Sequence, residues 1–383
     1  MSLLFKRRDL AALEIVERSR GIVAGSANVT AETAMRHSAV WACLRLRADL
    51  ISTMPVDSFR RVQGVQIETP KPPFLRKPDG TRDITEWLYS SQVDLDRYGN
   101  AYGVITARDA NGKPSAVELV SAGEVSVRGK GATVTEYRIG REKFEPHEVW
   151  HERQFTMAGI PVGLSPLANA AMSIGGYLSA QQFALDWFVN AVAPGGHLKN
   201  TARTLNDEQS DTAKRRFKAA VMDRDVLVTG SDWEFSPLQA AANDAAFLDE
   251  MKFGIGDVCR FFGVPGDMVD AETASGSITY ANVTQRNLQL LTLNLGPAIT
   301  RREVALSAAL PEPRYVKFNT DALLRMDPAG RAEVIKTAIE GRWLGVDEAR
   351  ELENRQPLTP EQEAQFGRLF GTRNQAPTTG AQP

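Results

Sequence analysis

Two long helical patterns enclose a short segment of a different kind, and this arrangement constrains the fold more than any other feature of the sequence. Residues 166–190 and 244–262 both carry apolar side chains at the spacing of a helix with one buried stripe. Residues 197–238, between them, combine short strand-like runs with one helical stretch that begins with a capping-box pattern at Asn206. The sequence therefore predicts two long helices that carry a small inserted β-α-β-β module.

The segment before the helix pair has the pattern of a mixed α/β unit. Apolar residues repeat at helical spacing over 38–51 and 84–95, and Asn111 followed by Gly112 is a strong signal for a β-hairpin. We expect residues 1–155 to build one core from both helices and several short strands. The runs typical of strands lie at 56–62, 101–107, 117–120, 124–127, 133–139 and 149–153.

Glycine and proline divide the segment after the helix pair. Gly263 and Pro265 form a stop signal for the second long helix, and a loop of small residues follows at 270–279. Pro297 is expected to break or kink a third helix over 282–310, because proline has no N–H to donate. The remaining predicted elements are a strand at 315–318, helices at 329–340 and 346–353, and a disordered tail from residue 371.

The charge balance argues against a protein whose main task is to grip nucleic acid. The 383 residues include 45 Lys and Arg against 47 Asp and Glu, whereas proteins that neutralise many phosphates carry a strong positive excess. No apolar run approaches the roughly 20 residues that a bilayer-spanning helix needs. Cys43 and Cys259 lie on apolar helical stripes and are expected to be reduced core residues. We therefore expect a soluble protein, made inside a cell, without membrane contact.

One motif, from His147 to His151, matches the H-E-x-x-H pattern of zinc metalloproteases. That pattern binds zinc on a helix, because residues four apart then share one face. Val149 and Trp150 favour a strand instead, where residues four apart are separated by about 13 Å and cannot bind one metal ion. A zinc metalloprotease that uses His147, Glu148 and His151 is therefore kept only as an alternative hypothesis, beside a generic oligomeric scaffold or adaptor.

No other motif in the sequence indicates catalysis. We find no Walker A pattern, no nucleophile elbow and no dinucleotide-binding fingerprint. The sequence therefore predicts no catalytic residues, no bound metal and no cofactor.

Several short segments follow one another in a characteristic order. They are 38–45 with Met54 and Pro55, 98–102, 149–151, 163–167, 188–196, Phe261-Phe262-Gly263-Val264-Pro265, 280–282, 293–297, 318–327 and 347–350. Their order and spacing over residues 30–355 resemble the portal proteins of long-tailed double-stranded DNA phages. The resemblance implies an α+β fold of the portal type, with a mixed α/β wing, long stem helices, a small inserted α/β clip and a short helical, crown-like C-terminal part.

The resemblance also implies a function and partners. Portal proteins form a closed ring, usually of twelve subunits, at one capsid vertex of the virion, and DNA is packaged and ejected through that ring. The implied partners are the terminase large subunit, a head–tail adaptor, the major capsid or scaffold protein, and double-stranded DNA that passes without sequence specificity. Assembly would start in the cytoplasm of the bacterial host. The portal itself is not the packaging ATPase, in agreement with the missing Walker A pattern.

The resemblance assigns roles to individual residues. The DNA-facing tunnel loop would contain Thr273, Ala274, Ser275, Gly276, Ser277, Ile278 and Thr279. The clip would contact its partners through Lys199, Arg203, Lys214, Arg215, Arg216 and Lys218. Gly263, Pro265 and Pro297 would set the helix stop and the kink.

Domain boundaries follow from the same resemblance. We expect an N-terminal arm at 1–30, a wing at 31–165, stem helices at 166–197 and 239–266 around a clip at 198–238, a tunnel loop at 267–281, a kinked helix with a wing strand at 282–318, a crown-like region at 319–370 and a disordered tail at 371–383.

Overall fold

The chain divides into two compact units, residues 1–320 and residues 321–383. The computed structural model describes residues 14–18, 29–190, 196–202, 204–222, 231–237, 244–269, 280–320, 328–353 and 355–370.

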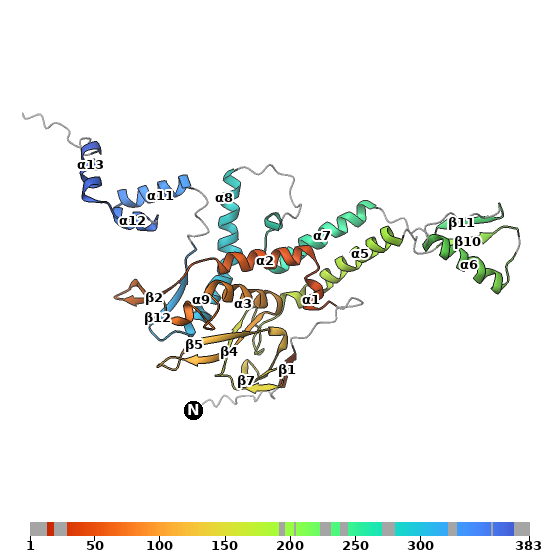
Figure 1. The fold of residues 1–383 in the computed structure, drawn as a ribbon, viewed down its shortest axis with the longest axis horizontal. Coiled ribbons are helices and arrows are strands. Elements are labelled where there is room, and N and C mark those ends of the chain that lie inside the picture. Colours follow the sequence, from red (N-terminus) through yellow and green to blue (C-terminus); the bar gives the residue numbers. More distant parts are fainter. Residues whose placement is uncertain are drawn as a thin grey trace, which may run out of the picture. The chain divides into compact units, whose positions relative to one another are not determined.

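Apart from the two strands of the inserted module, the described strands of the first unit form three small antiparallel sheets (Figure 1). One sheet has the strand order β12 (Arg314–Phe318), β2 (Val56–Val62) and β3 (Val65–Thr69). A second has the order β5 (Pro114–Val120), β4 (Asn100–Arg108) and β9 (Val149–Arg153). The third has the order β1 (Glu14–Arg18), β6 (Val125–Lys130), β7 (Thr133–Ile139) and β8 (Glu142–Phe144). The predicted hairpin at Asn111 and Gly112 is confirmed, because β4 and β5 pair on either side of it. The sequence predicts no strand at Glu14–Arg18, but β1 pairs with β6 there.

The predicted helices of the first unit are present, with two differences. The helices are α1 (Ala31–Ala34), α2 (Ser38–Ser52), α3 (Ile84–Tyr98), α4 (Pro166–Asn169), α5 (Ala171–Asn190), α6 (Asp207–Met222), α7 (Asp244–Phe262), α8 (Tyr280–Gln289) and α9 (Gly296–Ala308). The single helix predicted over 166–190 is divided, because the chain turns at Ala170 between α4 and α5. The second difference concerns Pro297.

Pro297 does not break its helix. The six residues Leu290–Leu295 form a π-helical turn, after which Gly296 donates its N–H to the carbonyl of Leu291. In a π turn each N–H bonds to the carbonyl five residues earlier, where an α-helix uses the carbonyl four residues earlier. This shift accommodates the proline, which has no N–H to donate. The break or kink predicted at Pro297 takes the form of a π turn upstream of the proline, and the helical path from α8 to α9 stays continuous.

One core joins α2 to the start of the long helix pair. Val40, Cys43 and Leu44 of α2 pack with Ile174 of α5 and Phe262 of α7 in one buried cluster. Apolar stripes on three helices thus meet in one layer, as the periodicity predicts.

Both cysteines lie inside this core. The Sγ atoms of Cys43 and Cys259 are 4.0 Å apart, and both residues are free thiols. Their predicted place in the core is confirmed. The sequence gives no sign that the two are neighbours, because 216 positions separate them.

The inserted module consists of β10 (Gly196–Asn200), α6 and β11 (Trp233–Pro237), with the two strands antiparallel. The predicted capping box opens α6: the Asn206 Oδ1 atom accepts a 2.9 Å bond from the Gln209 N–H, and Gln209 Oε1 lies 3.4 Å from the Asn206 N. The further strand predicted at 226–229 lies outside the described residues.

The second unit is helical in its described part. It contains α11 (Pro328–Glu340), α12 (Val346–Leu352) and α13 (Pro360–Phe370), and the two helices predicted at 329–340 and 346–353 match α11 and α12. The tail from residue 371 lies outside the described residues. No helix in the described ranges of either unit is long and apolar enough to cross a membrane.

Candidate functional site

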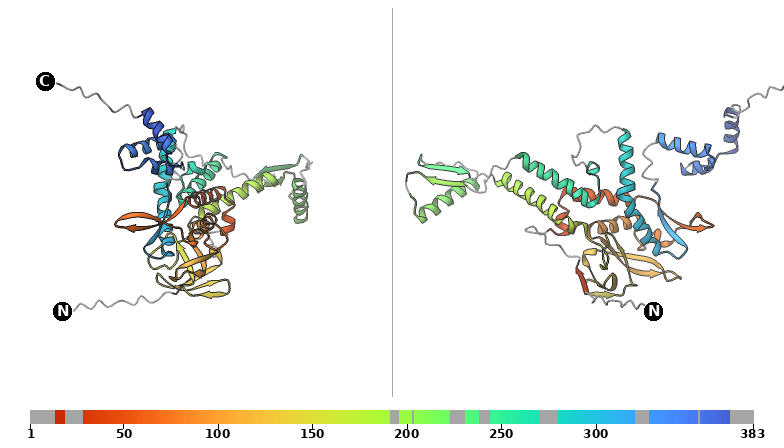
Figure 2. Two further views of the ribbon diagram at one scale, coloured as in Figure 1. Left: turned by 60° about the vertical axis from the view of Figure 1, so that its left-hand side comes forward. Right: turned by 180° about the vertical axis from the view of Figure 1, so that it is seen from behind.

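Helices α5 and α7 lie side by side, and the inserted module connects them in sequence (Figure 1, Figure 2). The Ser173 hydroxyl of α5 donates a hydrogen bond to the Asp257 carboxylate of α7, and the Tyr177 ring lies against Gly254. His37, which caps α2, stacks on Tyr177 with 3.8 Å between ring centroids. This antiparallel helix pair with a module at its far end is the arrangement expected of a stem and a clip.

The predicted helix stop at the end of α7 is confirmed. Gly263 has φ of +60°, a conformation that glycine adopts without strain, and the Val264 N–H bonds back to the Cys259 carbonyl at 3.0 Å. Asn294, in the π turn, donates to the Gly263 carbonyl at 2.7 Å. The end of α7 is therefore held by the helical segment that contains Asn294.

The predicted tunnel loop, from Thr273 to Thr279, lies outside the described residues. The residues on either side of it are described and are joined to each other. Arg286 of α8 forms a 2.8 Å ion pair with Asp267, just before the loop. This ion pair connects the segment before residues 270–279 to the helix that follows them.

A chain of buried polar groups ties the end of α7 to the body. Arg47 of α2 donates to the carbonyl of Phe262 at 3.1 Å and pairs with Asp96 of α3, also at 3.1 Å. Gln92 donates to the same carboxylate at 3.0 Å and accepts from Arg302 of α9 at 3.1 Å. Groups from four helices therefore share one continuous hydrogen-bond network, which connects the end of α7 to α2, α3 and α9.

Arg302 and Glu152 complete this network in the deepest part of the body. The side chain of Arg302 is 0% exposed and that of Glu152 is 2% exposed, with 3.5 Å between the Arg302 guanidinium and the Glu152 carboxylate. Arg302 also donates to the Ser91 hydroxyl at 2.6 Å. Burial raises the pKa of Glu152, and the guanidinium opposes that rise. Sequence reasoning did not identify this pair.

The zinc-protease hypothesis is wrong in the described structure. His151 lies on strand β9, as Val149 and Trp150 predict, while His147 lies in the turn before it. Both ring nitrogens of His151 are engaged, since Nδ1 is 2.9 Å from the Tyr137 hydroxyl and Nε2 is 3.1 Å from Asn100 Oδ1. Within the residues that the structure describes, no three His, Cys, Asp or Glu side chains are placed to hold a metal ion.

Asn100 and His151 instead hold the chain segment that leads into the stem. Asn100 accepts from the Gly163 N–H at 2.7 Å and donates to the Gly163 carbonyl at 2.8 Å. The adjacent Ser165 caps α4 by accepting from the Ala168 N–H at 3.0 Å. These residues therefore position the chain at the start of α4.

The predicted clip residues are partly described. Lys199 is exposed on β10, and Lys214, Arg215 and Arg216 are exposed on α6. Arg203 lies outside the described residues, and so does the side chain of Lys218. The three consecutive basic residues of α6 therefore offer an accessible positive surface on the inserted module.

The lowered pKa values of two buried histidines predict that the chain loses stability in mild acid. Burial lowers the pKa of His37 to about 4 and that of His151 to about 3. Both stay neutral in the folded chain, whereas the unfolded chain binds protons below about pH 6.5, so the free energy of unfolding falls as the pH decreases from there. For His37 the expected loss at pH 5 is about 2 kcal/mol.

Urea denaturation at pH 7 and pH 5 checks this expectation. His37→Asn keeps a capping oxygen but cannot titrate, so it should show a smaller difference between the two pH values than the unchanged chain. An equal pH dependence in both proteins would contradict the role of His37.

Comparison with known proteins decides the family. The sequence matches the family described as phage portal protein over residues 38–354. The chain belongs to the phage portal protein family. The expected identity and the α+β portal-type fold are thereby confirmed, and so is the role that goes with them: a ring-shaped channel at one capsid vertex of the phage particle for DNA packaging, ejection and head–tail connection.

Relatives and solved structures agree with this assignment. The chain is 28% identical over 356 residues to the portal protein of Enterobacteria phage HK97, covering 87% of this chain and 82% of that protein. It is 27% identical over 364 residues to the probable portal protein of Streptomyces phage phiC31, covering 88% of this chain and 78% of that protein. The structure of an HK97-family phage portal protein from Corynebacterium diphtheriae matches with a TM-score of 0.63 at 19% identity, over 80% of this chain and all of that chain. The neck of a native gene transfer agent particle, computed with C12 symmetry, matches with a TM-score of 0.57 at 19% identity, over 85% of this chain and 92% of that chain.

Proposed function

We propose that twelve copies of this portal subunit close into a ring, that α5 and α7 of each copy line the stem, and that the loop at 270–279 faces the DNA. The observation that carries the proposal is the helix pair itself, with the inserted module between its members in sequence and the Asp267–Arg286 ion pair at the root of the loop. The C12 symmetry of the similar neck particle supports the subunit number. Head-to-tail contacts between identical subunits form a ring whenever their rotation closes.

The proposed channel conducts duplex DNA of any sequence without holding it. A net charge of −2 per subunit leaves no excess of positive charge for a multi-phosphate grip that would stall translocation. Small uncharged side chains such as Ala274, Ser275 and Gly276 would make brief contacts with no base specificity. The loop thus touches DNA during passage and does not select it.

Bulky replacements in the loop test this part of the proposal. Gly276→Trp together with Ser277→Trp should narrow the channel, slow packaging and change the retention of packaged DNA. Both are measured with assembled particles. Trp343→Phe, which exchanges one large aromatic residue for another outside the loop, is the control. Unchanged packaging and unchanged retention would reject the loop as a DNA-facing element.

The inserted module is proposed to dock the partners of the ring. The terminase large subunit would engage it during packaging and a head–tail adaptor afterwards, through Lys199, Arg203, Lys214, Arg215, Arg216 and Lys218, while the wing meets the major capsid or scaffold protein. The exposed positions of Lys199, Lys214, Arg215 and Arg216 support this assignment. Charged residues on such a rim mainly accelerate and orient association.

Charge reversal at Arg215 and Arg216 checks the docking role. The double change to Glu should reduce packaging or adaptor binding while rings still form, because the reversal repels an acidic partner surface. Reversal of the neighbouring acidic residues, Glu208→Lys and Asp211→Lys, is the matched control on the same helix. Normal infectivity of the Arg215→Glu, Arg216→Glu particle would show that this surface does not dock a partner.

We infer that the subunit acts as a structural channel without catalytic activity, metal or cofactor. The family assignment and the absence of a Walker A pattern in the sequence support this inference. The energy for translocation would then come from the terminase.

A further inference from the structure

The described part of the second unit exposes several large apolar side chains and buries few. Among its described residues, the buried apolar side chains are those of Ala338 and Ala349. Trp343, Val346, Leu352 and other large apolar residues are exposed, Trp343 by 71%. A short segment without a core of its own folds stably only when another surface covers it.

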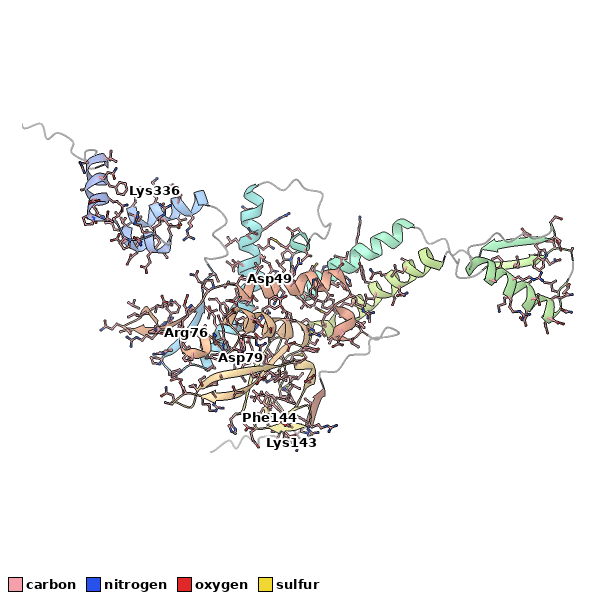
Figure 3. All side chains as sticks on the ribbon, in the orientation of Figure 1. Asp49, Arg76, Asp79, Lys143, Phe144 and Lys336 are labelled. Carbon is pink, nitrogen blue, oxygen red and sulfur yellow. The ribbon has the colours of Figure 1, made fainter. Side chains whose placement is uncertain are left out.

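A groove lies between α11 and α12. It has a volume of about 810 Å³, and Ile335, Ile339, Val346 and Leu352 supply apolar lining. The charged side chains that line it include four basic ones, Arg331, Lys336, Arg350 and Arg355, and two acidic ones, Glu340 and Glu353. Lys336 projects from α11 (Figure 3), and Arg331 is paired with Glu353. The groove therefore fits an amphipathic segment with an acidic end.

Helix α13 has the complementary character. Phe366 and Leu369, three residues apart, lie on one apolar stripe, and Leu369 is 63% exposed. Glu361 and Glu363 lie in its first turn. At 11 residues the helix is about 16 Å long, which is comparable to the 13-residue α11 that forms one wall of the groove.

The chain keeps α13 out of its own groove. Arg355 donates its N–H to the Arg350 carbonyl at 2.7 Å, and Arg350 Nε donates to the Gln356 carbonyl at 2.7 Å, so the connection after α12 is held against that helix. Thr359 then caps α13 by accepting from the Gln362 N–H at 3.3 Å. No residue of α13 lines the groove, and each one from Pro360 to Leu369 is exposed.

We propose that α13 of one subunit docks in the α11–α12 groove of the neighbouring subunit. This inference rests on the ring of the proposed function. Groove and helix are two different surfaces of one chain, so their contact is head-to-tail, the kind that generates a ring when it closes. The docked helix would bury its apolar stripe on Ile335 and Ile339 and bring Glu361 and Glu363 toward the basic rim, as in other complexes of an amphipathic helix with a groove. Helix α13 lies beyond residues 38–354, the part that matches the family.

Cross-linking between differently tagged full-length chains tests the proposal. One chain carries Ile339→Cys and the other Leu369→Cys; a short thiol cross-linker is added to the assembled protein, and heterodimers are counted on a denaturing gel. The native Cys43 and Cys259 are buried, and the unchanged chain gives the background. Val334→Cys replaces Ile339→Cys in the control, because Val334 is exposed on α11 and does not line the groove.

We expect at least about ten times more heterodimer from the Ile339–Leu369 pair than from the control pair, because docking raises the local concentration of the two thiols. Equal yields from the two pairs would overturn the proposal. It would also be overturned if a chain with both Ile339→Cys and Leu369→Cys formed cross-links only within itself. Electron microscopy of the same samples separates the two claims. Rings without the heterodimer reject only the α13 contact, whereas an absence of rings rejects the proposed function.

Discussion

Replacement of Arg302 by methionine is expected to lower the free energy of unfolding of the first unit by about 3–5 kcal/mol. Arg302 is fully buried, and its loss leaves the buried Glu152 carboxylate without its cation. It also leaves the Ser91 hydroxyl and the Gln92 carbonyl oxygen without their donor. Urea denaturation followed by circular dichroism measures the change.

Two further variants show whether the charge itself is responsible. Arg301→Met makes the same chemical change one residue away, at an exposed side chain whose guanidinium lies 5.9 Å from the Phe155 ring, and should cost at most about 1 kcal/mol. Adding Glu152→Gln to Arg302→Met removes the uncompensated carboxylate and should recover part of the loss. If Arg302→Met is no more destabilising than Arg301→Met, the buried network does not hold the stem to the wing.

Gly163→Ala is expected to lower the free energy of unfolding by about 3 kcal/mol. It should also weaken the anchoring of the chain at the start of α4. A Cβ atom at this position would lie 2.1 Å from the Gln154 carbonyl oxygen and 2.2 Å from that of Gly99. Both are backbone atoms, so the chain after β9 and the turn after α3 must move away from residue 163. That movement also breaks the two hydrogen bonds between Asn100 and Gly163.

Gly176→Ala is the matched control for this substitution. Gly176 lies within α5, where no atom is within 4 Å of an added Cβ, and alanine favours a helix over glycine by up to about 1 kcal/mol. Its denaturation midpoint should therefore stay the same or rise. Similar midpoints for Gly163→Ala and Gly176→Ala would contradict the close approach at Gly163.

Periodicity and capping signals were enough to predict most helices. The stripe through Val40, Leu44 and Ile51 predicts α2, and these three side chains are buried. Asn206 and Gln209 form the capping box that their spacing indicates. Such signals are local, because a helix is decided by residues that are three or four positions apart.

The buried network could not be predicted in the same way. Arg302 contacts Gln92, 210 positions away, and no pattern near either residue indicates that contact. Arg47 did carry a signal, since a charged residue on the apolar stripe of α2 requires a buried partner. Strand β1 was missed because its pairing with β6 is non-local, and the π turn was missed because the proline rule predicts an interruption but not its form.

Negative-stain electron microscopy of the purified full-length chain tests the central claim most directly. We expect ring-shaped particles with twelvefold symmetry and a central opening wide enough for duplex DNA. Monomers, or assemblies without an opening, at concentrations where the chain is folded would contradict it.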